Sequence, residues 1–364
     1  MIALRTLTDG GQQPIDIARM LSAWLGEAQK SLDIAIYDLK LDDDAETAVI
    51  GAIEDAGKRG VAVRVAYNAD YRFPLAATAP PKATPEDIEK LTVPTRGIPG
   101  IPDLMHHKFV VRDGASLWTG STNWTNESWS REENVIVTAD SADLAKAYTI
   151  GFEELWNGGD VMKSGFVEPR PVTVDGVQTR PWFCPGFGDA LAHRIAKACG
   201  RAKRRIRICS PVLTSGPILA TLCQIASEGK VDLGGCVDQT QIEEVLYQWR
   251  TNGVSAWKIP LLQAVLTRAP FSGKRSTPYT PTSVHDYMHA KITVADDTVF
   301  CGSFNLSRSG EKNAENMLEI QDAKIADELA AYVDSVRARY PKADPSEPAA
   351  SSAPAASGGP DGRG

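Results

Sequence analysis

Long apolar stretches are missing from this chain of 364 residues. A run of about eighteen uncharged apolar residues occurs nowhere, so the sequence predicts no membrane-spanning helix. The stretch from Met1 to Gly10 lacks the apolar core of a signal peptide, and we therefore expect a cytoplasmic protein. An extracellular lipase is disfavoured, unless the start of the chain has been trimmed.

Cysteine pairs at metal-binding spacing are also missing. No two of the cysteines are separated by only two residues, so a zinc site or a disulfide framework has little support. We expect buried free thiols instead. All of them lie in the second half of the chain: Cys184, Cys199, Cys209, Cys223, Cys236 and Cys301.

Excess positive charge is the third feature that the sequence lacks. The formal net charge is −7, which argues against a broad nucleic-acid-binding surface but leaves room for a local basic groove. The 43% hydrophobic and 23% charged content is typical of a globular protein. The length suits two ordinary domains or one large duplicated one.

One motif is present twice. Each copy has the pattern His-x-Lys-x4-Asp, then Gly-Ser-x-Asn, then a Glu-Asn pair whose Glu comes ten residues after that Asn. The first copy consists of His106, Lys108, Asp113, Ser121, Asn123 and Glu133. The second consists of His289, Lys291, Asp296, Ser303, Asn305 and Glu315. Two copies with this spacing are not a coincidence.

The apolar residues inside each motif predict a strand, at residues 109–111 and 292–294. Side chains two apart on a strand share a face, so the His and Lys of each copy project together. A core would make this pairing costly, because an unpaired charge must be desolvated. The pattern therefore favours a cleft that holds an anion.

The chemistry of the motif suits one phosphate. Two Lys, two Asn and two Ser can surround it as donors. One His can then attack phosphorus while the other protonates the leaving oxygen, because the unperturbed imidazole pKa lies near neutrality. A carboxylate on the far nitrogen of each ring would fix its tautomer, and Glu133 and Glu315 are the candidates.

The doubled motif resembles the signature of the phospholipase D superfamily, and the likeness extends from near the N-terminus to Tyr340. The resemblance implies a phosphohistidine intermediate and no requirement for a metal or other cofactor. By position, His106 resembles the nucleophile and His289 the acid and base. The remaining catalytic-motif residues resemble phosphate ligands (Lys108, Lys291, Ser121, Asn123, Ser303, Asn305), structural acids (Asp113, Asp296) and orienting carboxylates that each serve the His of the opposite half (Glu133, Glu315).

The rest of the chain repeats as well. Helical and strand patterns at 15–28, 31–38, 44–58 and 61–67 recur at 189–198, 205–209, 218–227 and 231–237, and each half ends in a helix, at 142–156 and 325–340. We expect an α/β protein of two similar lobes with mixed or mostly parallel sheets, related by a pseudo-two-fold axis around one shared active site. The predicted divisions are 1–167, 168–342 and a disordered tail at 343–364.

Two insertions precede the motifs, at 71–104 and 257–286. Long loops of this kind are usually functional or disordered, and their apolar residues either meet acyl chains or pack as ordinary helices. His107 points away from the face shared by His106 and Lys108, so we expect a structural role. His285 and His289 have the spacing of metal ligands on a helix, but His289 begins a strand and no third ligand is evident.

These features predict a phosphodiesterase that cleaves or transfers a phosphatidyl group. The expected partner is a phospholipid, met by a monomer through peripheral contact with a membrane. The duplication within one chain, the acidic balance and the apolar insertions favour this substrate. A metal-independent cytoplasmic nuclease is the alternative, supported by the basic run at 203–205. A scaffold that binds phosphate without cleaving it is the third hypothesis.

Overall fold

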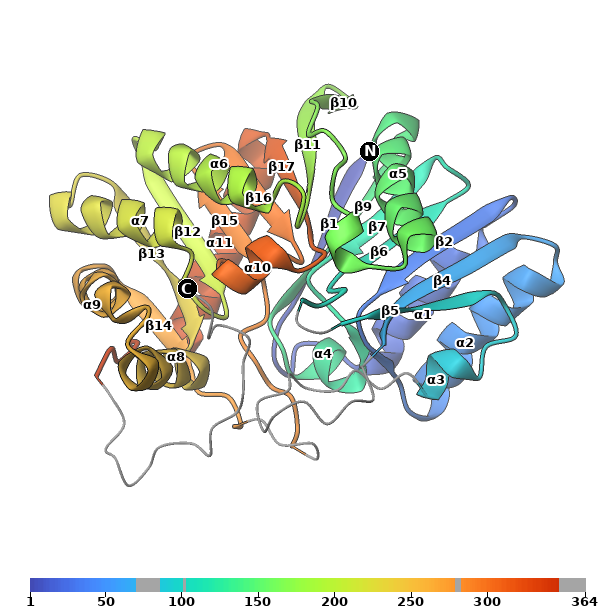
Figure 1. Ribbon diagram of the computed structural model, residues 1–364, viewed down its shortest axis with the longest axis horizontal. Coiled ribbons are helices and arrows are strands. Elements are labelled where there is room, and N and C mark those ends of the chain that lie inside the picture. The colour runs from blue at the N-terminus through green and yellow to red at the C-terminus, as the bar shows by residue number, and fades with distance from the viewer. Residues whose placement is uncertain (70–85, 101–102, 279–282, 347–364) are drawn as a thin grey trace.

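Two mixed sheets with matching strand order form the framework of the molecule (Figure 1). The computed structural model describes residues 1–69, 86–100, 103–278 and 283–346. The first sheet has seven strands in the order β1-β9-β7-β6-β2-β4-β5, and the second has eight in the order β10-β11-β17-β16-β15-β12-β13-β14. Apart from β10, every strand of the second sheet occupies the place of one strand in the first, so the sequence repeat is a repeat of fold.

The strands of the first lobe are β1 (Ile2–Leu7), β2 (Ser31–Ile36), β4 (Ala62–Ala69), β5 (Thr95–Pro99), β6 (Lys108–Arg112), β7 (Ser116–Gly120) and β9 (Asn134–Asp140). Those of the second lobe are β10 (Val172–Val174), β11 (Val177–Phe183), β12 (Arg205–Ser210), β13 (Asp232–Asp238), β14 (Phe271–Lys274), β15 (Ile292–Ala295), β16 (Thr298–Gly302) and β17 (Asn316–Gln321). A separate short pair joins β3 (Leu39–Lys40) to β8 (Trp124–Thr125).

Helices cover the outer face of each sheet. In the first lobe these are α1 (Pro14–Gly26) and α2 (Asp43–Lys58), and in the second they are α6 (Gly188–Arg201), α7 (Gly216–Glu228), α8 (Gln239–Asn252) and α9 (Ile259–Arg268). The apolar stripe of α1, including Leu21 and Leu25, packs against β2 residues such as Ile34. No helix in the described ranges is long and apolar enough to cross a bilayer.

A third apolar cluster joins the lobes. Its helices are α5 (Ala142–Gly158) and α11 (Ala323–Arg339), which lie between the two sheets. The ring of Tyr148 contacts Phe109 of its own lobe and Phe183 of the second lobe. The distances between ring centroids are 5.1 Å to Phe109 and 4.9 Å to Phe183. The Tyr332 hydroxyl on α11 donates to the Leu7 carbonyl at 2.6 Å. The shared core therefore fixes the lobes against each other.

The predicted helices and strands are present, with ends shifted by a few residues at most. The sheets are mixed, which is one of the two forms expected: among the described strands of the two large sheets, the pairs β2–β4, β4–β5, β12–β13 and β13–β14 are parallel and the other pairs are antiparallel. The motif hairpins β6–β7 and β15–β16 add antiparallel neighbours, because a short turn can only reverse the chain. The predicted division near residue 168 falls between α5 and β10.

The two insertions contain regular structure, and in the second the alternative of ordinary helix packing holds. Residues 95–99 form edge strand β5, and 259–274 form α9 and β14. Leu262, Val265 and Phe271 are buried in the second-lobe core, so these apolar residues are ordinary packing rather than an acyl-chain surface. The parts of the insertions at 70–85, 101–102 and 279–282 lie outside the described residues.

The predicted tail begins too early. Ala343 is buried, and its N–H donates to the Phe271 carbonyl at 2.9 Å. Asp344 donates its N–H to Gln239 Oε1 at 2.9 Å. Backbone pairing with the edge of β14 holds these residues in spite of their composition. The rest of the predicted tail, from residue 347, lies outside the described residues.

The motif aspartates serve the fold, as the resemblance implied. Asp113 and Asp296 follow β6 and β15 at backbone φ angles of 57° and 51°, seven residues from their histidines, which is about 20 Å of extended chain. The Asp113 carboxylate accepts N–H bonds from Gln29, Lys30 and Ser31, at 2.6–3.1 Å. Asp296 binds residues 203–205 in the same way. Each aspartate ties its motif hairpin to the turn that precedes the neighbouring strand, β2 in the first lobe and β12 in the second.

We predict that Asp113→Ala lowers the free energy of unfolding by about 1 to 2 kcal/mol, the cost of leaving capped N–H groups without a partner. Burial raises the pKa of Asp113, but the N–H groups of Ser31, Lys30 and Gln29 outweigh it and leave the pKa below 3.8. The stabilisation is therefore complete above pH 3.8 and is lost as the pH falls below that value. Urea unfolding at pH 7 and pH 3 measures it, with exposed Glu328→Ala as control. An unchanged midpoint at pH 7 would contradict this role.

Candidate active site

His106 lies just before β6 and meets a carboxylate from the other lobe. Its Nδ1 is 2.8 Å and 2.9 Å from the two carboxylate oxygens of Glu315, which precedes β17 and is fully buried. The Asn313 amide donates to the same carboxylate at 3.4 Å. The Tyr37 ring packs edge-on against the imidazole, with 4.8 Å between centroids. The expected pairing of His106 with Glu315 across the lobes is confirmed.

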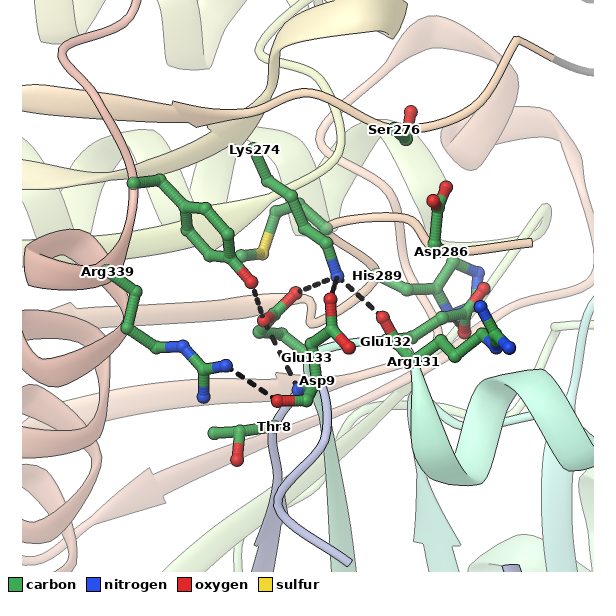
Figure 2. A network of polar contacts seen from close by, with 12 residues as sticks. Thr8, Asp9, Arg131, Glu132, Glu133, Lys274, Ser276, Asp286, His289 and Arg339 are labelled. Carbon is green, nitrogen blue, oxygen red and sulfur yellow. Dashed lines mark hydrogen bonds and ion pairs between the residues drawn. The ribbon is translucent and has the colours of Figure 1, made fainter. Parts of the chain in front are cut away.

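His289 has a different partner from the one that the sequence predicts. Its Nδ1 is 3.3 Å from Glu132 Oε2 and 3.2 Å from Asn134 Oδ1. Glu133 is not the orienting carboxylate. It is fully buried and turned to the second lobe, where its Oε2 lies 2.8 Å from Lys274 Nζ (Figure 2).

The reason is a shift of one residue between the two halves. Each motif histidine follows a methionine whose backbone bridges to the opposite lobe. Met105 bridges to Ala314, and Met288 bridges to Glu133. Glu133 therefore corresponds in space to Ala314 and not to Glu315, although the spacing in sequence suggests Glu315.

The shift exchanges a carboxylate and an amide. Asn134 occupies the place of Glu315, and Glu132 occupies the place of Asn313. In both halves the amide donates to the carboxylate two residues away, at 3.1 Å for Asn134 to Glu132. In the sequence, the adjacent pair Glu132-Glu133 was the one indication that either carboxylate could be the partner of His289.

The two lysines are buried beside the histidines. Lys108 Nζ donates to the His106 carbonyl at 2.7 Å, and Lys291 Nζ donates to the His289 carbonyl. Burial lowers the pKa of Lys108 to about 7, against the opposing effect of Glu315, Asp38 and Glu132. Burial and the charge of Lys108 hold the pKa of Lys291 well below its usual value. Because the charge of Lys108 acts on Lys291, these lysines of opposite lobes lie in one site.

The histidines share that site. Burial, followed by the charges of Lys291, Lys108 and His106, lowers the pKa of His289 well below 6.5. Burial and the same two lysines lower the pKa of His106. Both imidazoles are therefore neutral in the free protein near pH 7.

The carboxylates respond in the opposite direction. Burial raises the pKa of Glu315 to about 8 and that of Glu132 to about 7. In the tautomer with its proton on Nδ1, His106 donates to the Glu315 carboxyl group, whose oxygens lie 2.8 Å and 2.9 Å away. This form leaves the lone pair of His106 Nε2 available.

The motif asparagines have polar atoms without a protein partner. Asn123 and Asn305 follow β7 and β16 at the sheet edge where Lys108 and Lys291 lie, because β7 and β16 run antiparallel to β6 and β15. The side-chain oxygen of each is buried and has no hydrogen-bond partner in the part of the chain that is described. This is the condition expected of amides that await a ligand.

The motif serines do not have the phosphate-binding place that the sequence predicts. The Ser121 hydroxyl donates to Asn134 Oδ1 at 2.7 Å and accepts the Val135 N–H at 2.9 Å. Ser303 accepts the Asn316 N–H at 3.0 Å. Both serines are fully buried: Ser121 holds Asn134, which contacts His289, and Ser303 holds the backbone of Asn316 next to Glu315. A Cβ on the preceding glycine, Gly120, would lie 2.1 Å from the Val135 carbonyl oxygen, which explains the glycine.

The remaining expectations have clear outcomes. His107 is buried against Phe109 and Phe183, and its Nδ1 lies 3.2 Å from the Asn316 amide, a position that suits the expected structural role. All six cysteines are free thiols, and only Cys223 is not fully buried. Within the described ranges, no three His, Cys, Asp or Glu side chains are arranged to hold a metal ion.

Comparison with known proteins agrees with this architecture. Residues 21–156 and 195–337 match the protein family described as "Cardiolipin synthase, PLD-like domain". This match covers most of the chain and both lobes, so the chain belongs to that family and thereby to the phospholipase D superfamily.

Individual relatives match over part of the chain. A mitochondrial cardiolipin hydrolase from Xenopus laevis is 33% identical over 144 residues, which are 39% of this chain and 62% of that protein. The mitochondrial cardiolipin hydrolase of Homo sapiens is 29% identical over 155 residues, 42% of this chain and 56% of that protein. The chain thus spans about three fifths of the length of these curated relatives.

A solved structure shows the same fold. The phosphatidylserine synthase of Haemophilus influenzae Rd KW20 aligns over 92% of this chain and 86% of its own, with a TM-score of 0.62 and 11% sequence identity. At this identity the likeness concerns the two-lobed fold alone.

We predict that the site binds sulfate more weakly as the pH rises above about 7, by up to about tenfold per pH unit for one coupled proton. Sulfate keeps its charge over this range, whereas Lys108, with a pKa of about 7, loses its own. Isothermal titration between pH 6.5 and 9 measures the affinity. Lys108→Arg keeps a positive charge throughout and should give a shallower decline. The same affinity at pH 6.5 and 9 would contradict the prediction.

Proposed function

We propose that this chain is a phospholipase D-type phosphodiesterase that cleaves or transfers the phosphatidyl group of a phospholipid. One observation supports the chemistry most directly: two buried histidines from opposite lobes, each beside a carboxylate, share one site with two lysines. The names of the relatives and of the family support a phospholipid, cardiolipin above all, as substrate.

In the first step, His106 Nε2 attacks phosphorus and the bond to the leaving oxygen breaks. Glu315 accepts the Nδ1–H bond and stabilises the charge that grows on the ring. His289 gives its Nε2 proton to the leaving alcohol, which departs neutral. The product is a phosphoryl group bound to His106.

In the second step, His289 removes a proton from water or from an acceptor alcohol. The oxygen attacks phosphorus, the bond to His106 Nε2 breaks, and both rings return to their starting forms. Water gives hydrolysis and an alcohol gives transfer. The bound phosphodiester anion offsets the charges of Lys108 and Lys291, which lets His289 carry the proton that the first step needs.

The lysines and asparagines are proposed to stabilise negative charge on the bound phosphate. Lys108 and Lys291 lie where negative charge builds on the equatorial oxygens of phosphorus, in a buried site where such attraction is strong. Asn123 and Asn305 lie at the same sheet edge, and their side-chain NH2 groups are the donors that would bind a phosphate oxygen. This set supports binding of one phosphate between the lobes.

The nuclease hypothesis loses its main support from the sequence. Arg204 pairs with Asp297, and Arg205 pairs with Asp327, so two cations of the run at 203–205 are neutralised. They lie at the turn held by Asp296, at the end of β15 away from His289. The phospholipid hypothesis therefore remains the stronger of the two.

We predict that His106→Ala lowers turnover by at least about a thousandfold and abolishes an acid-labile phosphoryl-enzyme, because the nucleophile is lost. Cardiolipin vesicles, phosphatidylcholine vesicles and single-stranded DNA are incubated in parallel with the protein and a chelator. Release of the headgroup or of phosphatidic acid, against release of nucleotides, is measured.

Each outcome separates the hypotheses. Lipid cleavage without DNA cleavage supports the proposal, and the reverse supports the nuclease. Sulfate binding with neither activity supports the phosphate-binding scaffold. Normal lipid turnover by His106→Ala would show that the assigned nucleophile is wrong. His193→Ala, at an exposed position on α6, is the matched control and should retain full activity.

A further inference from the structure

Lys274 at the end of β14 forms a buried polar network between the lobes. Its side chain is 4% exposed, and its Nζ points into the first lobe (Figure 2). There it donates to the Arg131 carbonyl at 2.6 Å and to Glu133 Oε2 at 2.8 Å, and it lies 3.3 Å from Asp9 Oδ2. A buried ammonium with three oxygen partners has a single well-defined position.

Other groups from the second lobe complete the network. The Tyr340 hydroxyl donates to Glu133 Oε1, and Lys274 Nζ lies 5.7 Å from the centre of the Tyr340 ring. Arg339 donates to the Asp9 carbonyl at 2.6 Å. Both carboxylate oxygens of Glu133 are therefore engaged, which keeps this side chain turned away from His289.

The network holds the backbone from which His289 is contacted. Arg131 and Glu133 are fixed by Lys274, and the Glu133 backbone bridges to Met288. Successive side chains of an extended segment point to opposite sides. With Glu133 fixed on one side, Glu132 and Asn134 are presented on the other, where both reach His289 Nδ1.

The orientation of His106 does not depend on the Lys274 network. Ala314 stands in the place of Glu133, and Glu315 contacts the ring directly at 2.8 Å. At His289 the contacts are longer, 3.2 Å and 3.3 Å, and they are divided between an amide and a carboxylate. The exchange of carboxylate and amide thus makes His289 the histidine whose orientation depends on the neighbouring backbone.

We propose that Lys274 is a positioning residue for His289: through Glu133 it sets Glu132 and Asn134 on the ring and so aims His289 Nε2 at the reacting oxygen. The inference rests on the proposed two-step reaction, in which His289 is the acid and base. Nothing in it involves His106, and this separation makes it testable.

The variant Lys274→Met removes the charge and keeps the bulk. With bis(p-nitrophenyl) phosphate, the first nitrophenolate leaves without a proton, so attack by His106 stays fast. The second step still needs His289 as base. We expect a burst of nitrophenolate close to one per enzyme, followed by a steady-state rate lower by roughly tenfold to a hundredfold. Lys274→Arg should recover part of that rate.

Two further variants act as comparisons. Glu133→Gln should show the same burst and slow steady state. In the double variant the steady-state rate should fall little further than in Lys274→Met alone, because both substitutions break the same Lys274–Glu133 ion pair. Lys230→Met removes an exposed lysine of the same lobe and should behave as the unaltered protein. Loss of the burst together with the steady state would overturn the proposal, because it would show that Lys274 supports both histidines.

A measurement without turnover distinguishes this inference from the proposed function. In protein labelled with ¹⁵N-histidine, Lys274→Met should shift the ring-nitrogen resonances of His289 and leave those of His106 in place; His289→Gln and His106→Gln assign the signals. Unchanged His289 resonances, or equal shifts at both rings, would overturn the inference. If the unaltered protein cleaves no phosphodiester, the proposed function fails while this result still decides the positioning role.

Discussion

The cost of burying positive charge governs the centre of this molecule. Lys108, Lys291 and the two histidines are removed from water in one site, and each lobe supplies to the other a carboxylate that reduces this cost. Neither lobe satisfies its own histidine: Glu315 reaches His106, and Glu132 reaches His289. The active site therefore exists only where the lobes meet, and the shared apolar core around Tyr148 and Phe183 is what fixes that meeting.

Duplication gives this arrangement its symmetry, and a shift of one residue breaks it. His106 has a direct carboxylate, whereas His289 has an amide and a more distant carboxylate, Glu132, which adjoins Glu133 of the Lys274 network. A two-step displacement asks different things of its histidines, since one ring must attack phosphorus and the other must move a proton. The structural difference matches that division of labour, because a firmly held Nδ1–H suits a nucleophile.

Much of the fold follows from local sequence. The repeated alternation of helix and strand predicted the lobes, because amphipathic periodicity and turn residues depend only on near neighbours. The edge strands β5 and β14 were missed, because they form by pairing with strands that are distant in the sequence. The same pairing orders Ala343 and Asp344, whose composition predicts a disordered tail.

The sequence by itself determined which groups are proposed to react: the spacing of His, Lys and Asn in two copies predicted one phosphate site, and the motif aspartates bind backbone N–H groups at the far ends of the hairpins. Only the tertiary structure decided which carboxylate serves His289, what Ser121 and Ser303 hold, and that Lys274 belongs to the surroundings of the site. The physical reason is that these depend on register between strands of different lobes, where one added residue turns every following side chain to the opposite face. The spacing of residues along the sequence does not specify that register.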